Sequence, residues 1–151
     1  MRSKMALVLL TLMTSLCFAA SQKAPTKSKY LEPTGAVFMF SEKGGTYYEM
    51  HYKIRKALPG RVYFVVIFEN PEAPNDPLIT EFELPPDAKA IVFESRGIHS
   101  IRNNERYKVN LSMYRDAAHT KQLDQHDQEV LFSMPRQLLG DLRQRYGLTV
   151  Q

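Results

Sequence analysis

Cysteine is nearly absent from this sequence, and tryptophan is absent altogether. The single cysteine, Cys17, lies in an N-terminal apolar segment, so the chain beyond it offers no disulfide, no thiolate metal site and no cysteine nucleophile. No apolar run reaches the roughly 20 residues that a helix needs to cross a bilayer. A glycine-rich phosphate loop and a G-x-S-x-G motif are also missing, which argues against nucleotide binding and serine hydrolase chemistry.

The first residues are typical of a secretory signal peptide. Arg2 and Lys4 give a positive start, and an apolar run of about a dozen residues follows. Small residues before the cut predict cleavage after Ala19 or after Ser21, and both cuts remove Cys17. We therefore expect residues 1–20 to be a signal peptide. The mature protein should reach the periplasm or the medium, with a Gram-negative bacterium as the favoured source because cysteine-free exported domains of this size are common there.

The mature chain is close to neutral. Arg2 and Lys4 leave with the signal, so 18 of the 20 basic residues remain against 16 acidic ones, and we expect no nucleic-acid partner. Residues 22–33 hold three lysines, two prolines and few apolar groups. This composition predicts a flexible basic tail, in which the stretch Lys23–Lys29 could make weak contact with an anionic surface.

Short β-rich runs separated by turn residues follow the tail, as in an all-β sandwich or barrel. We expect seven strands, at residues 36–40, 47–55, 61–69, 78–84, 90–94, 107–114 and 128–132. In the second run Tyr48, Met50 and Tyr52 alternate with Glu49 and His51. This period of two predicts one buried and one solvent-exposed face.

The hydrophobic period changes after the last run. An apolar stripe at helical spacing is formed by Leu138, Leu139, Leu142 and Tyr146. Ser133 could cap such a helix, Pro135 is tolerated in its first turn, and Gly147 fits its end. We therefore expect one amphipathic helix over residues 135–146 that packs on the sandwich, within a single domain over residues 34–151.

The sixth run opens with a tyrosine in a distinctive setting. In the sequence Ile101-Arg-Asn-Asn-Glu-Arg-Tyr107 an apolar residue lies six positions before a tyrosine that begins an alternating strand. This spacing resembles the tyrosine corner of fibronectin type III and immunoglobulin-like sandwiches. The resemblance implies an immunoglobulin-like β-sandwich of antiparallel strands over residues 34–134, with Tyr107 at the corner and Ile101 as its apolar partner. It implies no activity, because such sandwiches carry unrelated functions.

Histidines and carboxylates are densest between the sixth and seventh runs. His119, Asp124 and His126 could hold zinc or copper, because both metals accept imidazole nitrogen and carboxylate oxygen. The alternative is a solvated hairpin, since strand alternation sends His126 and Asp127 to opposite faces. We expect no metal and no cofactor, and the rival hypothesis is a metal-binding or metal-carrying periplasmic protein that uses these three residues.

Protein recognition is the function that remains. No histidine has a serine or an acid at a recognisable catalytic spacing, so we expect no enzyme. Tyr47 and His51 share one strand face, and Tyr63 begins a second row with Val65 and Ile67 on a run whose continuous apolar character predicts a central strand. We favour coverage of that second row by the C-terminal helix, with partner binding as the alternative for part of it. The sequence thus predicts a non-enzymatic interaction or structural module with an unidentified protein partner in the cell envelope, bound through Tyr47, His51 and Tyr63.

Overall fold

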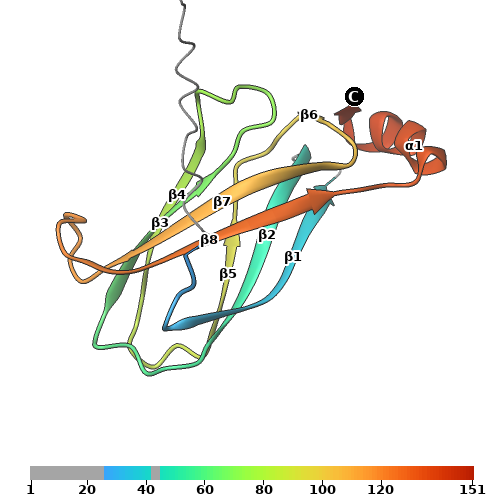
Figure 1. Cartoon of the computed structure of the whole chain (residues 1–151). Coiled ribbons are helices and arrows are strands. Elements are labelled where there is room, and N and C mark those ends of the chain that lie inside the picture. Colours follow the sequence, from blue (N-terminus) through green and yellow to red (C-terminus); the bar gives the residue numbers. More distant parts are fainter. Residues whose placement is uncertain (1–25, 42–44) are drawn as a thin grey trace, which may run out of the picture.

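Two antiparallel sheets form the body of the protein (Figure 1). The computed structural model describes residues 26–41 and 45–151. One sheet has the order β1 (Leu31–Ser41), β2 (Gly45–Ile54), β5 (Ala90–Glu94). The other has the order β4 (Leu78–Leu84), β3 (Val62–Phe68), β7 (Glu105–Tyr114), β8 (Gln122–Phe132). A short parallel pair, β6 (Ser100–Ile101) with β9 (Thr149–Val150), and helix α1 (Arg136–Tyr146) complete the described part of the chain.

The all-β sandwich predicted from the sequence is confirmed, with nine strands rather than seven in the described part of the chain. The two additional strands, β6 and β9, have two residues each, which is too short for any hydrophobic period. The last predicted run was placed too late, because β8 begins at Gln122 rather than near residue 128. Its polar first half looks like a loop in the sequence, but it pairs with β7, with His126 opposite Leu111.

The core lies between the two sheets and follows the predicted alternation. On β2 the side chains of Tyr48, Met50 and Tyr52 are almost completely buried. β3 lies between β4 and β7 and is central, as expected from its uninterrupted apolar run. The ring of Tyr48 packs against Phe38, 4.7 Å away, and against Phe68, 5.5 Å away, so aromatic contacts join the sheets.

Tyr107 makes the contacts that define a tyrosine corner. Its side chain is 3% exposed, and its hydroxyl oxygen accepts a hydrogen bond of 2.8 Å from the backbone N–H of Arg102. Ile101, the predicted apolar partner, is 1% exposed. The ring edge also meets Phe38 and Tyr48, each 6.2 Å away, so this residue closes the end of the core. Sequence spacing therefore located a structural feature correctly.

We expect Tyr107→Phe to lower the free energy of unfolding by about 1 kcal/mol, the usual net value of one buried hydrogen bond. The ring and its packing stay in place, so the loss isolates the bond to Arg102. Denaturant unfolding measures it. Tyr114→Phe on the same strand is the control, because no hydrogen bond involves its hydroxyl within the described residues. Equal midpoints for Tyr107→Phe and the wild type would contradict the corner's contribution.

Helix α1 lies at one end of the sandwich, beyond β8 and beside β9 (Figure 1). It begins at Arg136, and Gly147 ends it in the left-handed conformation at a φ of 68°. Leu142 is buried, and Tyr146 packs on Phe40 at 5.5 Å. The predicted cap is wrong, because the hydroxyl of Ser133 instead donates to the side-chain oxygen of Asn104.

The prediction that α1 covers the row Tyr63, Val65 and Ile67 is also wrong. The pairing of β9 with β6 draws the C-terminal segment to the end of the sandwich, away from the outer face of β3. The row is half-buried by its own sheet. The alternative, partner binding through part of this row, therefore stays a hypothesis.

The predicted flexible tail is wrong for residues 26–33. Tyr30 and Leu31 are buried and β1 starts at Leu31, so the few apolar side chains of this segment join the core. The composition of the segment does not indicate a strand here, because Pro33 and Gly35 are typical turn residues. In the structure they lie at an irregularity within the β1–β2 ladder. The signal peptide, the cleavage sites and residues 22–25 lie outside the described residues. Within the described ranges, no helix is long and apolar enough to cross a membrane.

Candidate interaction surfaces

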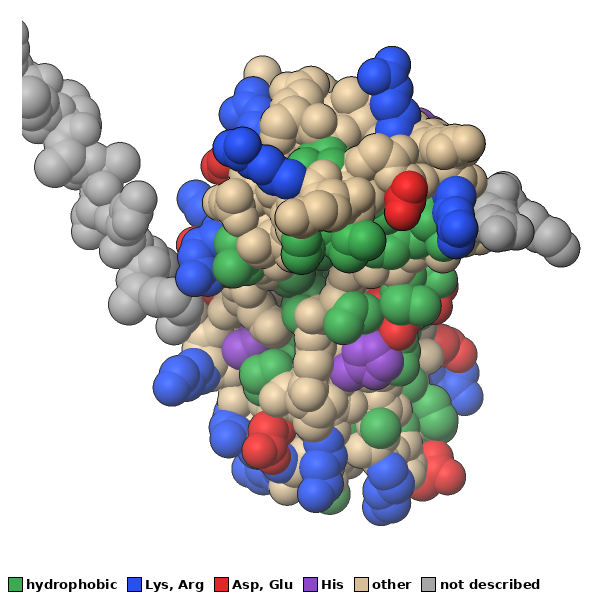
Figure 2. Space-filling model, turned by 90° about the vertical axis from the view of Figure 1, so that its right-hand side faces the viewer, with side chains coloured by type: hydrophobic (Ala, Val, Ile, Leu, Met, Phe, Trp, Pro, Cys, Tyr) green, Lys and Arg blue, Asp and Glu red, His purple; other side chains and the backbone are tan. Residues whose placement is uncertain are grey.

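The outward side of the β1-β2-β5 sheet carries exposed apolar side chains on β1 and β5, with a half-buried tyrosine, Tyr47, on β2 between them. On β1, Val37 is 42% and Met39 is 38% exposed, and on β5, Val92 is 49% exposed. The strand register places Met39 opposite Tyr47, and Val92 opposite His51. We call these five residues the outer β1-β2-β5 face. Figure 2, seen from the side where β1 lies in Figure 1, shows hydrophobic side chains gathered over the middle of the molecule beside a histidine.

Two carboxylates belong to the same side of the sheet: Glu49 lies between Tyr47 and His51 on β2, opposite Val37, and Glu94 lies next to Val92 on that side of β5. Glu49 and Glu94 lie directly opposite each other on β2 and β5. Like charges in this position destabilise a sheet. The Nε2 atom of His51 lies 2.6 Å from Oε1 of Glu49, so the contact with the imidazole offsets part of the repulsion between the two carboxylates. Glu94 is exposed, and a cation from a partner could pair with it without any movement of the strands.

The three residues predicted to form a binding surface do not lie together. Tyr47 and His51 lie on β2, whereas Tyr63 lies on β3 of the other sheet. All three point away from the core, because each alternates with a buried neighbour along its strand. The prediction of outward-facing side chains is right. Their membership of one surface could not be tested from the sequence, since it depends on which sheet each strand joins.

A hollow of about 250 Å³ lies on the outer side of the β4-β3-β7-β8 sheet, under the β7–β8 connection. Its walls are formed by Tyr63, Glu81, Phe82, Glu83, Ala117 and His119. His119 packs on Tyr114 at 5.0 Å and adopts a φ of 54°, so the connection turns back over the sheet. The hollow thus combines aromatic rings with two carboxylates. It is shallow and open rather than an enclosed active-site pocket.

The structure separates the residues of the predicted metal site. His119 lies in the β7–β8 connection beside the hollow, whereas Asp124 and His126 lie on β8 and bind the N-terminal segment, residues 26–30. The Nδ1 atom of His126 accepts the N–H of Ser28 at 3.3 Å. Within the described residues, no group of three histidine, cysteine, aspartate or glutamate side chains is arranged to hold a metal ion.

Asp124 is the main anchor of the N-terminal segment. Its Oδ2 atom accepts hydrogen bonds from the hydroxyl of Ser28 and from the backbone N–H groups of Lys29 and Tyr30, the last two at 2.9 and 3.3 Å. Ser28 is 3% and Tyr30 is 6% exposed, so the donors of these two residues have little access to water, whereas Lys29 is exposed. The polar start of β8 therefore serves to hold a segment almost one hundred residues earlier in the chain, with a separation of 96 positions between Ser28 and Asp124.

Asp127 extends the same contact along β8. Its backbone N–H donates to the carbonyl of Thr26 at 2.8 Å, and its carboxylate accepts the N–H of Thr26 at 3.1 Å. Burial alone would raise the pKa of this carboxyl. The hydrogen bonds from Thr26, Asn110 and Gln125 outweigh that effect and hold the pKa below its ordinary value, so the carboxylate form is favoured.

Comparisons with known proteins leave the chain without a family. No protein-family profile and no curated protein matches it. Among solved structures, a β-glucuronidase of Bacteroides uniformis is 14% identical, with a TM-score of 0.39 over 68% of this chain and 13% of that chain. Bacteroides uniformis β-glucuronidase 2, covalently bound to cyclophellitol-6-carboxylate aziridine, is 12% identical, with a TM-score of 0.37 over the same shares. The chain spans about an eighth of these enzymes, and similarities this distant carry no argument about its activity.

Sequence patterns missed most of the outer β1-β2-β5 face. Val37, Met39 and Val92 belong to runs that are apolar at almost every position, so alternation cannot say which side chains face outward. The β1–β2 and β2–β5 registers decide it. Tyr47 and His51 were found because β2 alternates apolar with polar residues.

Proposed function

We propose that this protein is an exported, non-enzymatic module that binds another protein of the cell envelope through the outer β1-β2-β5 face. The observation that carries the proposal is the set of exposed apolar side chains on that face, above all Val92, Val37 and Met39. Exposed apolar groups gathered on one side of a sheet are typical of protein interfaces. Tyr47 lies among them, and tyrosine is enriched at such interfaces because it combines an apolar ring with a hydrogen-bonding tip.

The carboxylates on this side of the sheet indicate the chemistry of the partner. Glu49 and Glu94 face each other across β2 and β5, so an apolar partner surface that carries a lysine or arginine would reduce their repulsion. The ionic contact should set orientation and the rate of association, whereas the apolar contact should supply most of the affinity.

The contacts of three of the four histidines support a role without catalysis. His51 is hydrogen-bonded to Glu49, His119 packs on Tyr114, and His126 accepts a backbone N–H group. None of these is the pair of hydroxyl and imidazole that an activated serine requires. Binding therefore accounts for the described surface better than hydrolysis does.

Export is part of the proposal and rests on the N-terminal sequence. The positive start at Arg2 and Lys4 and the apolar run that follows support cleavage after Ala19 or Ser21. N-terminal sequencing of protein recovered from the envelope or the medium tests this. An intact Met1 on that protein would contradict export by cleavage.

Val92→Glu is expected to weaken capture of the envelope partner about tenfold, because it places a charge at the most exposed apolar position of the face, beside Glu94. The measurement is capture from envelope extract on immobilised protein, followed by titration of the identified partner. Leu131→Glu is the matched control, since Leu131 is 47% exposed on β8 and Val92 is 49% exposed on β5. Equal loss in both variants, or no loss in Val92→Glu, would assign binding to another surface.

A further inference from the structure

The two lateral edges of the sandwich differ in whether another segment of the chain lies along them. On one side the N-terminal segment lies along β8, where Thr26 and Asp127 exchange backbone and side-chain hydrogen bonds. On the other side, β4 pairs only with β3, and β5 only with β2, among the described residues. Among the described residues, a single hydrogen bond of 3.0 Å, from the hydroxyl of Thr80 to the carbonyl of Glu94, links those two strands. The outer edge of β4 therefore offers backbone groups for another strand.

Two of the three outward side chains along this open edge are acidic. Ile79, Glu81 and Glu83 are exposed on β4 and alternate with inward-facing residues. Glu83 is paired with Arg61 at 3.0 Å. Glu81 has no hydrogen bond or ion pair within the described residues, and it lines the same hollow as Tyr63, from which it is displaced by one diagonal step of the β3–β4 ladder. An unpaired carboxylate beside an aromatic ring suits a cationic side chain, which can contact both.

We propose that β4 binds an extended basic peptide segment of another protein by strand addition, a second binding site distinct from the outer β1-β2-β5 face. In an antiparallel arrangement the added strand would place basic, basic and apolar side chains at alternate positions opposite Glu83, Glu81 and Ile79. The basic side chain opposite Glu81 would extend over the hollow toward Tyr63. Main-chain hydrogen bonds give affinity in this mode, and the alternate side chains give selectivity.

A second copy of the chain is a poor occupant of the same edge. Antiparallel pairing of two β4 strands centred on Glu81 would place the two copies of this carboxylate opposite each other, and like charges in that position are destabilising. Charged residues on an edge strand also discourage such self-association in general. A basic strand would instead be attracted to this edge, since it places a positive charge opposite each carboxylate.

The test uses a seven-residue peptide, the length of β4, with lysine at two alternate positions, valine at the next position on the same side, and threonine elsewhere. Titration of the peptide into the full mature protein, followed by NMR, should shift the amide signals of β4 and of the β7–β8 connection. Glu81→Lys should weaken binding about tenfold, because it replaces attraction with repulsion at the central pair.

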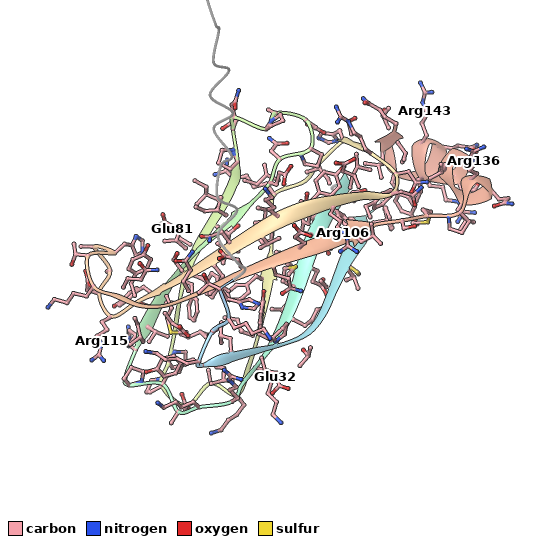
Figure 3. The ribbon with its side chains drawn as sticks, viewed as in Figure 1. Glu32, Glu81, Arg106, Arg115, Arg136 and Arg143 are labelled. Atoms are coloured by element: carbon pink, nitrogen blue, oxygen red, sulfur yellow. The ribbon has the colours of Figure 1, made fainter. Side chains whose placement is uncertain are left out.

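Glu32→Lys is the matched control, because it makes the same charge change at an exposed position on β1, well apart from Glu81 (Figure 3). It should leave the affinity unchanged. A second control peptide carries the two lysines at adjacent positions, so that they point to opposite sides of the strand, and it should bind more weakly. Equal affinity of both peptides, equal loss in both variants, or shifts confined to the outer β1-β2-β5 face would each overturn the proposal. The last of these outcomes would leave the proposed function intact.

Discussion

Raising the pH from 8 to 11 is expected to lower the free energy of unfolding by about 3 kcal/mol through two tyrosines in the core. Burial raises the pKa of the Tyr48 hydroxyl far above its ordinary value, and the neighbouring Tyr107 and Glu69 raise it further. Burial also raises the pKa of Tyr52. In the unfolded chain both hydroxyls ionise near pH 10, whereas in the folded protein they stay neutral. Their contribution is therefore complete below about pH 10 and decreases by about 1.4 kcal/mol per tyrosine for each pH unit above it.

Urea unfolding at the two pH values measures this loss, and two variants assign it. Tyr48→Phe combined with Tyr52→Phe should be less stable at pH 8, because the hydroxyls donate to the carbonyl of Glu69 and the side chain of Gln128, each at 2.9 Å. Its stability should then depend much less on pH. Tyr63→Phe, in the half-buried outer row, should keep the slope of the wild type. An equal slope in the double variant and the wild type would contradict the assignment.

The parts of the fold that could be predicted are those where local chemistry and tertiary structure agree. β4 was placed at its observed bounds because Pro77 precedes it and Pro85 and Pro86 follow it, and proline cannot continue a ladder. Tyr107 could be assigned because a fixed spacing to Ile101 reflects a local geometry of the chain. In both cases the deciding interactions lie within a few residues in sequence.

The errors share a physical cause, which is stabilisation by distant parts of the chain. The segment before β1 looks disordered by composition, but Asp124 and His126 supply the acceptors that order it. Those two residues in turn look like metal ligands when only their own neighbourhood is considered. The separation between Ser28 and Asp124, 96 positions, explains why no local pattern reveals the contact.

The candidate binding surfaces were predictable only strand by strand. Alternation showed that Tyr47, His51 and Tyr63 point outward, which the structure shows as well. Their division between two faces follows from sheet order, and the apolar neighbours of Tyr47 follow from register. Neither the order of strands in a sheet nor their register can be derived directly from a single sequence. The open edge at β4 is a property of the same kind, since it depends on which strands find no neighbour.

Asp124→Ala is expected to lower the free energy of unfolding by about 2–3 kcal/mol and to release the N-terminal segment. The change leaves the buried hydroxyl of Ser28 and the N–H of Lys29 without this acceptor, whereas the N–H of Tyr30 keeps the hydroxyl oxygen of Ser28 at 3.1 Å. An unpaired buried donor costs more than the net value of a hydrogen bond, because it has lost its contact with water as well. Denaturant unfolding gives the free energy. Limited trypsin digestion, read by mass spectrometry, reports release of the segment as faster cleavage after Lys29.

Asp116→Ala is the matched control for this contact. Asp116 also accepts three hydrogen bonds, from the N–H and hydroxyl of Thr120 and from the N–H of Lys121, at 3.1, 2.9 and 2.8 Å. Its partners lie four and five positions away in the exposed β7–β8 connection, so the change should leave cleavage after Lys29 as in the wild type. Asp124→Asn keeps one oxygen acceptor and should fall between Asp124→Ala and the wild type. If Asp124→Ala and Asp116→Ala open the Lys29 site equally, or if neither does, the N-terminal segment is held by its apolar contacts at Tyr30 and Leu31 rather than by the carboxylate on β8.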